Sequence, residues 1–176
     1  MPIVSKNEVK YNHYFDRKVC RHYVNGILTV LHCHHYTCLY TQLAVDAGET
    51  DLLKESSREI FRDVLDKYFN ENPETDILQS KIEIGCQYYS LLGLGTMKVI
   101  FLGDDHGRVE VPSSHTDSGW IKKWGKYDKP VNYITAGYIE ALFESVLNTP
   151  QKTFAAEEIQ SIVMGADISK FKVSRR

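Results

Sequence analysis

Residues 31–38, with the sequence LHCHHYTC, contain three histidines and two cysteines. Imidazole and thiolate groups bind zinc, copper and iron, and a thiolate beside an imidazole can also act as a nucleophile. If this stretch is helical, His34 and Cys38 lie one turn apart on the same apolar face, and His35 flanks them. Cys33 then points in nearly the opposite direction. We therefore expect a divided cluster, in which His34, His35 and Cys38 face the interior together.

The first interpretation of these residues is a metal site. His34, His35 and Cys38 would bind zinc, copper or iron, with Cys86 from another helix as a fourth ligand. The paired Cys-x-x-Cys element of many zinc sites is missing, so the spacing specifies no particular metal. The cofactor therefore stays open between a transition metal and none.

The second interpretation is an enzyme that uses a thiol. Cys38 or Cys33 would be the nucleophile, and His34 would be the general base that lowers the pKa of the thiol. A third group can come from the polar segment that contains His115 and Asp117. The substrate would then be a small organic molecule.

The remaining interpretations involve no catalysis. Free cysteine is among the most frequently buried residue types, and a buried histidine commonly does no more than form a hydrogen bond. Alternatively, the same kinds of side chain line the pocket of an organic ligand without a metal. The polar groups of that pocket would be His34, His35, Cys38, Cys86, Tyr88 and His115. The residues by themselves leave all of these interpretations open.

The composition indicates a single globular domain over residues 1–176. The net charge is −2, from 21 basic and 23 acidic residues, which argues against nucleic acid or a membrane surface as a partner. No apolar run approaches the length of a membrane helix, and the N-terminal residues MPIVSKNEVK lack the apolar core of a signal peptide. The four cysteines are therefore expected to be reduced thiols in the cytoplasm.

Hydrophobic periodicity and turn signals predict an α+β fold. A helix at 26–47 would carry the histidines and cysteines and end at Gly48, a suitable C-cap. Residues 114–130 would form a long polar loop, and residues 1–25 an N-terminal arm or strand. Further elements are expected at 10–15 (strand), 50–69, 77–92 and 133–147 (helices), and 96–102, 108–113, 152–163 and 169–173 (strands). The result is an antiparallel sheet of about four strands packed against four helices, with one helix inserted between the strand pairs.

Three segments resemble the 4-vinyl-reductase-like, or hydrocarbon-binding, domain family. They are 92-LGLGTMKVIF-101, where a helix ends in Gly-x-Gly before a strand, 135-TAGYIEALFESVLN-148, the helix after the long loop, and 157-EEIQSIVMGADISKF-171, the closing hairpin. Together they place the resemblance over about residues 75–173. The resemblance implies a fold shared with subunits of a vesicle-tethering complex, and an apolar pocket between helices and sheet.

Many members of this family bind zinc through two cysteines of the closing hairpin and an acidic residue just upstream. In this sequence Ser161 and Ser169 stand at the two cysteine positions, and Glu158 matches the acidic position. A serine hydroxyl is a poor zinc ligand compared with a thiolate, an imidazole or a carboxylate. We therefore do not expect the family's zinc site in this chain.

The resemblance and the residues together favour a small-molecule-binding or sensory domain that forms a homodimer. Its ligand would be small and hydrophobic or aromatic, and a sensing role would need a separate output protein. One alternative is a small-molecule enzyme, dependent on a thiol or a metal and hydrolase-like, that uses Cys38 and His34. Another is a subunit or chaperone that uses the fold to bind another protein.

Overall fold

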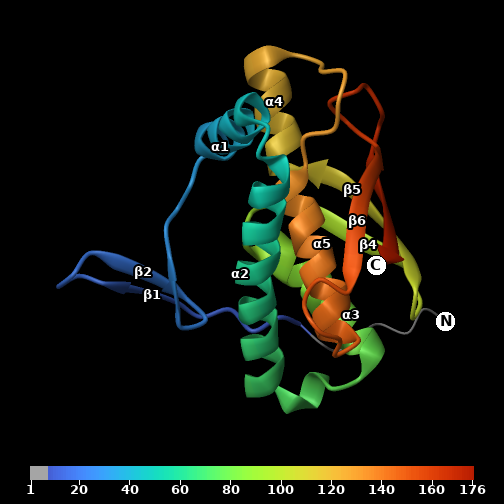
Figure 1. Cartoon of the computed structure of the whole chain (residues 1–176). Helices are drawn as coiled ribbons and strands as arrows, with labels where there is room; N and C mark the ends of the chain where they lie inside the picture. The colour runs from blue at the N-terminus through green and yellow to red at the C-terminus, as the bar shows by residue number, and fades with distance from the viewer. Residues whose placement is uncertain (1–7) are drawn as a thin grey trace.

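The computed structural model of the chain describes residues 8–176 (Figure 1), so part of the expected arm at 1–25 lies outside the described residues. In chain order the elements are β1 (His13–Asp16), β2 (Arg21–Val24), β3 (Ile27–Thr29), α1 (His34–Ala47), α2 (Thr50–Glu71), the short 3-10 helix η1 (Pro73–Thr75), α3 (Leu78–Leu91), β4 (Gly95–Leu102), β5 (His106–Ser114), α4 (His115–Trp124), α5 (Tyr133–Val146), β6 (Phe154–Gln160) and β7 (Ser169–Arg175). The α+β class is confirmed, with five α-helices and two antiparallel sheets within the described range.

The three N-terminal strands form a small antiparallel sheet in the order β1-β2-β3. Asn25 and Gly26 make the two-residue turn between β2 and β3, with φ angles of 48° and 73°. Positive φ at both positions is typical of the type I′ turn that Asn-Gly pairs favour in hairpins. Figure 1 shows β1 and β2 projecting away from the body of the molecule.

The helix predicted at 26–47 begins only at His34, so the first third of that prediction is wrong. Residues 27–29 instead form strand β3, because the preceding turn and the β-branched Ile27 and Thr29 favour a hairpin. Cys33 has extended backbone angles (φ −83°, ψ 162°) and lies just before the first helical turn.

From His34 onward the segment is helical, as predicted. His34 and Cys38 lie one turn apart in the helix. The helix ends at Gly48, as predicted, where φ is 73° and the backbone N–H donates to the carbonyl of Val45 at 3.2 Å. Leu31 precedes the helix and is 72% exposed, so the buried face of α1 does not continue into the residues before His34.

The body of the molecule is a four-stranded antiparallel sheet in the order β4-β5-β7-β6 with helices on one face. α3 packs against β4, α5 packs against β6 and α3, and α2 packs on α5 (Figure 1). The core lies between these layers and includes Leu65, Ile84, Val109, Leu142, Phe143, Phe154 and Phe171. Alternate residues of β5 and β7 are buried and accessible, as expected when one face of a sheet is covered and the other is open.

Helix α5 runs through the centre of the body and is buried over nearly its whole length. Two of its buried residues, Glu140 and Glu144, are acidic. Helix α2 supplies the compensating cations: Lys54 and Arg58 each lie 3.6 Å from the Glu140 carboxylate, and Arg62 lies 3.8 Å from that of Glu144. Buried carboxylates are tolerated only when they are paired in this way, so these contacts fix how α2 lies on α5.

Helix α4 was not among the four predicted helices. It lies in the segment 114–130, which the sequence predicted to be a loop. Its start is capped, because the hydroxyl oxygen of Ser114 accepts a hydrogen bond from the backbone N–H of Asp117 at 3.1 Å. Lys122 and Lys123 in the last turn suit the negative end of the helix dipole, and Gly125 follows. The Ser-x-x-Asp spacing was a signal for this helix that the prediction did not use.

No helix within residues 8–176 combines the length and the apolar character that a membrane crossing requires.

Candidate functional site

The predicted site residue Cys38 lies in a small second core between α1 and α4, with Trp120, Val131 and Val163. It is fully buried, and its thiol donates a hydrogen bond to the carbonyl oxygen of Thr116 at 3.5 Å. Burial raises the pKa of the Cys38 thiol, which therefore stays protonated at neutral pH. A buried, protonated thiol is less nucleophilic than an exposed thiolate.

Three predicted histidines meet beside this small core. The ring centroid of His34 lies 4.3 Å from that of His35 and 6.0 Å from that of His115, and the sulfur of Cys33 lies 4.0 Å from Nδ1 of His35. Burial, together with His35, lowers the pKa of His34, so its imidazole is neutral near pH 7. Nε2 of His34 is buried and has no hydrogen-bond partner among the described residues.

The other predicted site residues, Cys86 and Tyr88, lie on α3 against the main core, not beside Cys38. Tyr88 is buried, and its ring centroid lies 5.4 Å from that of Tyr68. Burial raises the pKa of both Cys86 and Tyr88. The structure thus brings His34, His35 and His115 together and separates them from α3. Across residues 8–176, no group of three or more His, Cys, Asp or Glu side chains is arranged to hold a metal ion.

A buried polar network that the sequence did not reveal is centred on Asn132. The Asn132 amide nitrogen donates to both carboxylate oxygens of Asp117, at 2.9 Å each, and to Oε1 of Glu158 at 2.8 Å. Its backbone N–H donates to Oε2 of Glu158 at 3.2 Å. The hydroxyl of Ser114 donates to the Asn132 side-chain oxygen at 2.7 Å. One amide group therefore joins two carboxylates and the cap of α4.

The closing hairpin completes this network through its serines. The hydroxyl of Ser169 donates to Oδ2 of Asp117 at 3.2 Å and accepts from the backbone N–H of Ile162 at 3.0 Å. The hydroxyl of Ser161 is buried and has no partner within the described part of the chain. By the sequence resemblance, Ser161 and Ser169 stand where many members of the 4-vinyl-reductase-like family carry zinc-binding cysteines. In this chain hydrogen bonds among oxygen and amide groups connect the region.

The electrostatics of the network centre on Asp117, which is 1% exposed. Burial raises the pKa of its carboxyl to about 6, and the nearby Glu158 carboxylate acts in the same direction. The hydrogen bonds from Asn132 and Ser169 favour the charged form and limit the rise. A carboxyl whose pKa lies this close to neutrality is characteristic of functional sites, although structural networks also produce it.

A cavity of about 340 Å³ adjoins the network, at the starts of α2 and α5 and beside β6. Its size falls in the range of small-molecule pockets. Its walls combine small apolar side chains and one aromatic ring with a few charged groups: Asp51, Lys54, Pro130, Asn132, Tyr133, Ala136, Ala155, Ala156, Glu157 and Glu158. Because Asn132 and Glu158 line it, the cavity connects directly to the buried network. We take this pocket as the candidate functional site.

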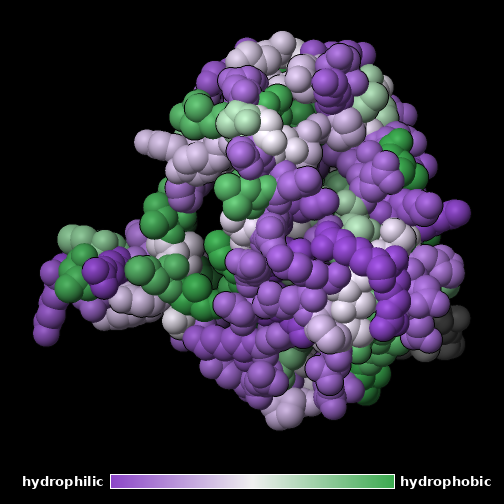
Figure 2. Space-filling model, in the orientation of Figure 1, coloured by the Kyte–Doolittle hydropathy of each residue, from purple (hydrophilic) through white to green (hydrophobic). Residues whose placement is uncertain are grey.

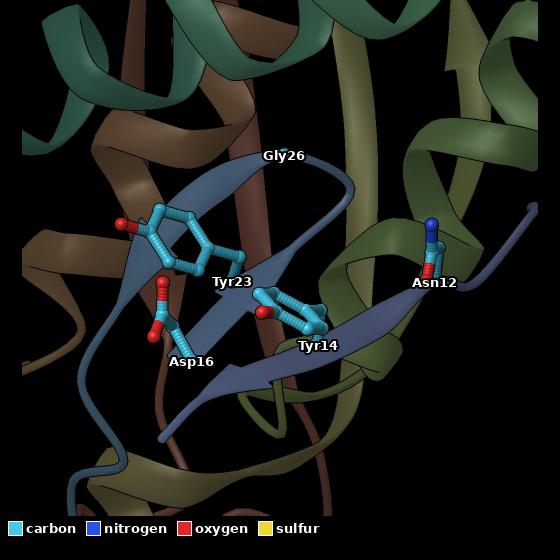
Figure 3. Close-up of a pocket in the computed structure, with 5 residues that line it drawn as sticks. All are labelled: Asn12, Tyr14, Asp16, Tyr23 and Gly26. Carbon is cyan, nitrogen blue, oxygen red and sulfur yellow. The ribbon is translucent and has the colours of Figure 1, made fainter. Parts of the chain in front are cut away.

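A different hollow lies on the N-terminal hairpin (Figure 3) and has a volume of about 410 Å³. Figure 3 shows the Tyr14 and Tyr23 side chains beside each other, with Asp16 near Tyr23. The two tyrosine ring centroids are 6.3 Å apart. All the residues that line this hollow are exposed or half-buried, so it lacks the desolvated polar groups that give a ligand site its specificity.

The architecture defines this chain as having the fold of 4-vinyl-reductase-like domains and of vesicle-trafficking subunits, as the sequence resemblance implied. No protein-family model and no curated protein matches the sequence. Solved structures with the fold include the phenol-responsive sensory domain of the transcription activator PoxR with phenol. Its TM-score is 0.77 at 12% identity, over 93% of this chain and 84% of that one.

Two further structures share the fold at lower TM-scores. A vinyl-4-reductase family protein from Methanocaldococcus jannaschii has a TM-score of 0.56 at 15% identity, over 84% of each chain. Subunit 3 of the trafficking protein particle complex from Naegleria fowleri, covalently bound to palmitic acid, has a TM-score of 0.55 at 14% identity, over 81% of this chain and 91% of that one. The similarity reaches well beyond the residues 75–173 on which the resemblance rested.

Proposed function

We propose that this chain is a small-molecule-binding domain with a sensory role, and that its ligand is a small aromatic molecule carrying a hydroxyl or amino group. The observation that carries the proposal is the pocket of about 340 Å³ whose wall includes the buried Asn132 and its hydrogen-bonded partner Glu158. A largely apolar pocket with a few convergent polar groups is the usual form of a ligand site. The phenol held by the PoxR sensory domain is a ligand of this class in the same fold.

The lining side chains suit such a ligand in a simple arrangement. The aromatic ring would lie against Tyr133 and the small apolar side chains of Ala136 and Ala155. Its hydroxyl or amino group would form a hydrogen bond with the Glu158 carboxylate, which is only half-buried and borders the pocket. Lys54, also in the lining, lies 3.6 Å from Glu140 and so is held in place at the rim.

The proposal predicts that phenol and substituted phenols bind at this pocket. In calorimetric titrations of the purified chain, Ala155→Leu should weaken binding at least tenfold, because the larger side chain fills the space for the ring. Glu158→Gln should weaken the binding of phenols in a similar way, since it removes a charged acceptor. Tyr14→Ala, in the hairpin hollow, is the matched control and should bind as the unaltered chain does. Full affinity in Ala155→Leu, or its loss in Tyr14→Ala, would contradict this placement.

We also propose that two copies of the chain associate through the hairpin and α1. Figure 2 shows hydrophobic side chains gathered on the projecting hairpin and beside α1. The aliphatic members are between 40% and 72% exposed: Leu28, Val30, Leu31, Leu39 and Leu43. An exposed apolar surface of this kind commonly marks a protein–protein contact, and a second copy is the partner that a homodimer requires.

Native mass spectrometry tests the dimer. The unaltered chain should be dimeric, and the double variant Leu39→Lys with Leu43→Lys should be monomeric, because two buried charges would face each other across the contact. Leu52→Lys, at an equally exposed position on α2, should remain dimeric. A monomeric unaltered chain, or a dimeric double variant, would rule out this surface.

A further inference from the structure

The face of the larger sheet that the helices leave open carries a groove of about 430 Å³. It crosses all four strands and is lined by Ile100 of β4, His106 to Glu110 of β5, Lys170 to Val173 of β7 and Ile159 of β6. None of these residues lines the candidate ligand pocket. The groove is therefore a separate site on the molecule.

The centre of the groove is basic. Arg108 and Lys172 are directly opposite each other in the β5–β7 register, and both are exposed. Like charges placed opposite each other in a sheet destabilise it. Within residues 8–176, no carboxylate forms an ion pair with either side chain, whereas the adjacent Lys170 lies 3.9 Å from Glu110. Arg108 and Lys172 are therefore not ion-paired within the described residues, although Glu157 of β6 is opposite Lys172 in the β6–β7 register.

The two ends of the groove are apolar. Ile100 on β4 is 55% exposed and Ile159 on β6 is 59% exposed. Because β4 and β6 are the outer strands, three inter-strand spacings of about 4.8 Å separate them, which gives about 14 Å. An extended peptide covers this distance in about four to five residues. The groove therefore matches a short segment with an apolar residue at each end and acidic residues between them.

We propose that this groove binds an acidic segment of a partner protein. Arg108 and Lys172 would pair with carboxylates of that segment, and Ile100 and Ile159 would contact its two apolar side chains. A peptide fits better than a nucleic acid, because Glu110 interrupts the basic row and would repel a continuous phosphate backbone. A peptide can place a neutral residue at that point.

Fluorescence anisotropy with a labelled peptide of sequence Leu-Glu-Ser-Glu-Leu tests the proposal on the full chain. Arg108→Glu and Lys172→Glu should each weaken binding tenfold or more, and raising the salt from about 50 to 300 mM should weaken it as well. Lys122→Glu on α4, beside His34 and away from the sheet, is the matched control and should change the affinity less than twofold. Arg108→Gln gives a milder change at the same position, so that a folding defect in the charge reversal can be recognised.

Three results would overturn the proposal. The first is equal binding of a peptide with Gln in place of both Glu residues. The second is unchanged affinity in the folded Arg108 and Lys172 variants. The third is a single-stranded oligonucleotide of equal charge that displaces the peptide and binds more tightly, which would assign the face to nucleic acid. The pocket variant Ala155→Leu should still bind the peptide, so failure of the ligand site and failure of this surface remain distinguishable.

Discussion

Replacement of Gly137 by alanine is expected to lower the free energy of unfolding by about 2–3 kcal/mol, although alanine is the better helix former by about 1 kcal/mol. The reason is the close approach of α5 to α2. A methyl group on Gly137 would lie 2.3 Å from the carbonyl oxygen of Lys54 and 2.8 Å from the backbone nitrogen of Arg58. Both are atoms of a helix backbone that cannot move aside, because Lys54 and Arg58 are also held by the buried Glu140.

Chemical denaturation monitored by circular dichroism measures this effect. Ser56→Ala, at an exposed position on the same helix α2, is the control and should change the stability by less than about 0.5 kcal/mol. A Gly137→Ala variant as stable as the original chain would show that α2 can move away from α5. It would thereby contradict the rigid contact described above.

Replacement of Asn132 by leucine is expected to cost about 3–5 kcal/mol at pH 8. Leucine has nearly the same size but offers no donor, so Asp117 and Glu158 lose the amide that joins them. An uncompensated buried charge costs this much when its partner is removed. Asn70→Leu makes the same change at an exposed position of α2 and should be nearly neutral.

The cost of the Asn132→Leu variant should also depend on pH. The folded-state pKa of Asp117 is about 6, above the ordinary value of 3.8, so the folded state binds the proton more tightly than the unfolded state. The contribution of Asp117 to the free energy of unfolding therefore falls as the pH rises from about 4 to about 6, and it is constant above about pH 6. Without the hydrogen bonds from Asn132 the pKa of Asp117 rises further, so the pH range over which stability falls extends to higher pH. The deficit of the variant should be smaller at pH 5 than at pH 8; an equal deficit at both would contradict a charged Asp117.

The sequence predicted the part of the fold that local patterns determine. The helices near 50–71 and 78–91 and the closing strands have clear periodicity, and each occurs close to its predicted place. The start of α1 was missed because an apolar helical pattern continues across 26–33, and the Asn25-Gly26 turn determines the structure there. Helix α4 was missed because its polar composition is typical of a loop, although Ser114 and Asp117 form a helix cap.

The candidate site was less accessible to sequence reasoning. The conspicuous residues His34 and Cys38 lie one turn apart on α1, where Cys38 belongs to a small core against α4 and His34 lies beside His115. The pocket instead depends on Asn132, whose partners Asp117 and Glu158 are 15 and 26 residues away along the chain. Only tertiary folding decides which polar residues meet over such distances. Ser169 belongs to this network, but nothing in its position in the sequence indicated Asn132.

Helix α4 contacts both the polar network beside the pocket and the small apolar core that contains Cys38. Its first turn contains Asp117 and therefore belongs to the network beside the pocket. Half a turn later, Gly119 lets α1 approach so closely that an added methyl group would lie 2.5 Å from the sulfur of Cys38. The hydrogen bonds of Asp117 and the packing of α1 thus depend on the same two turns of one helix.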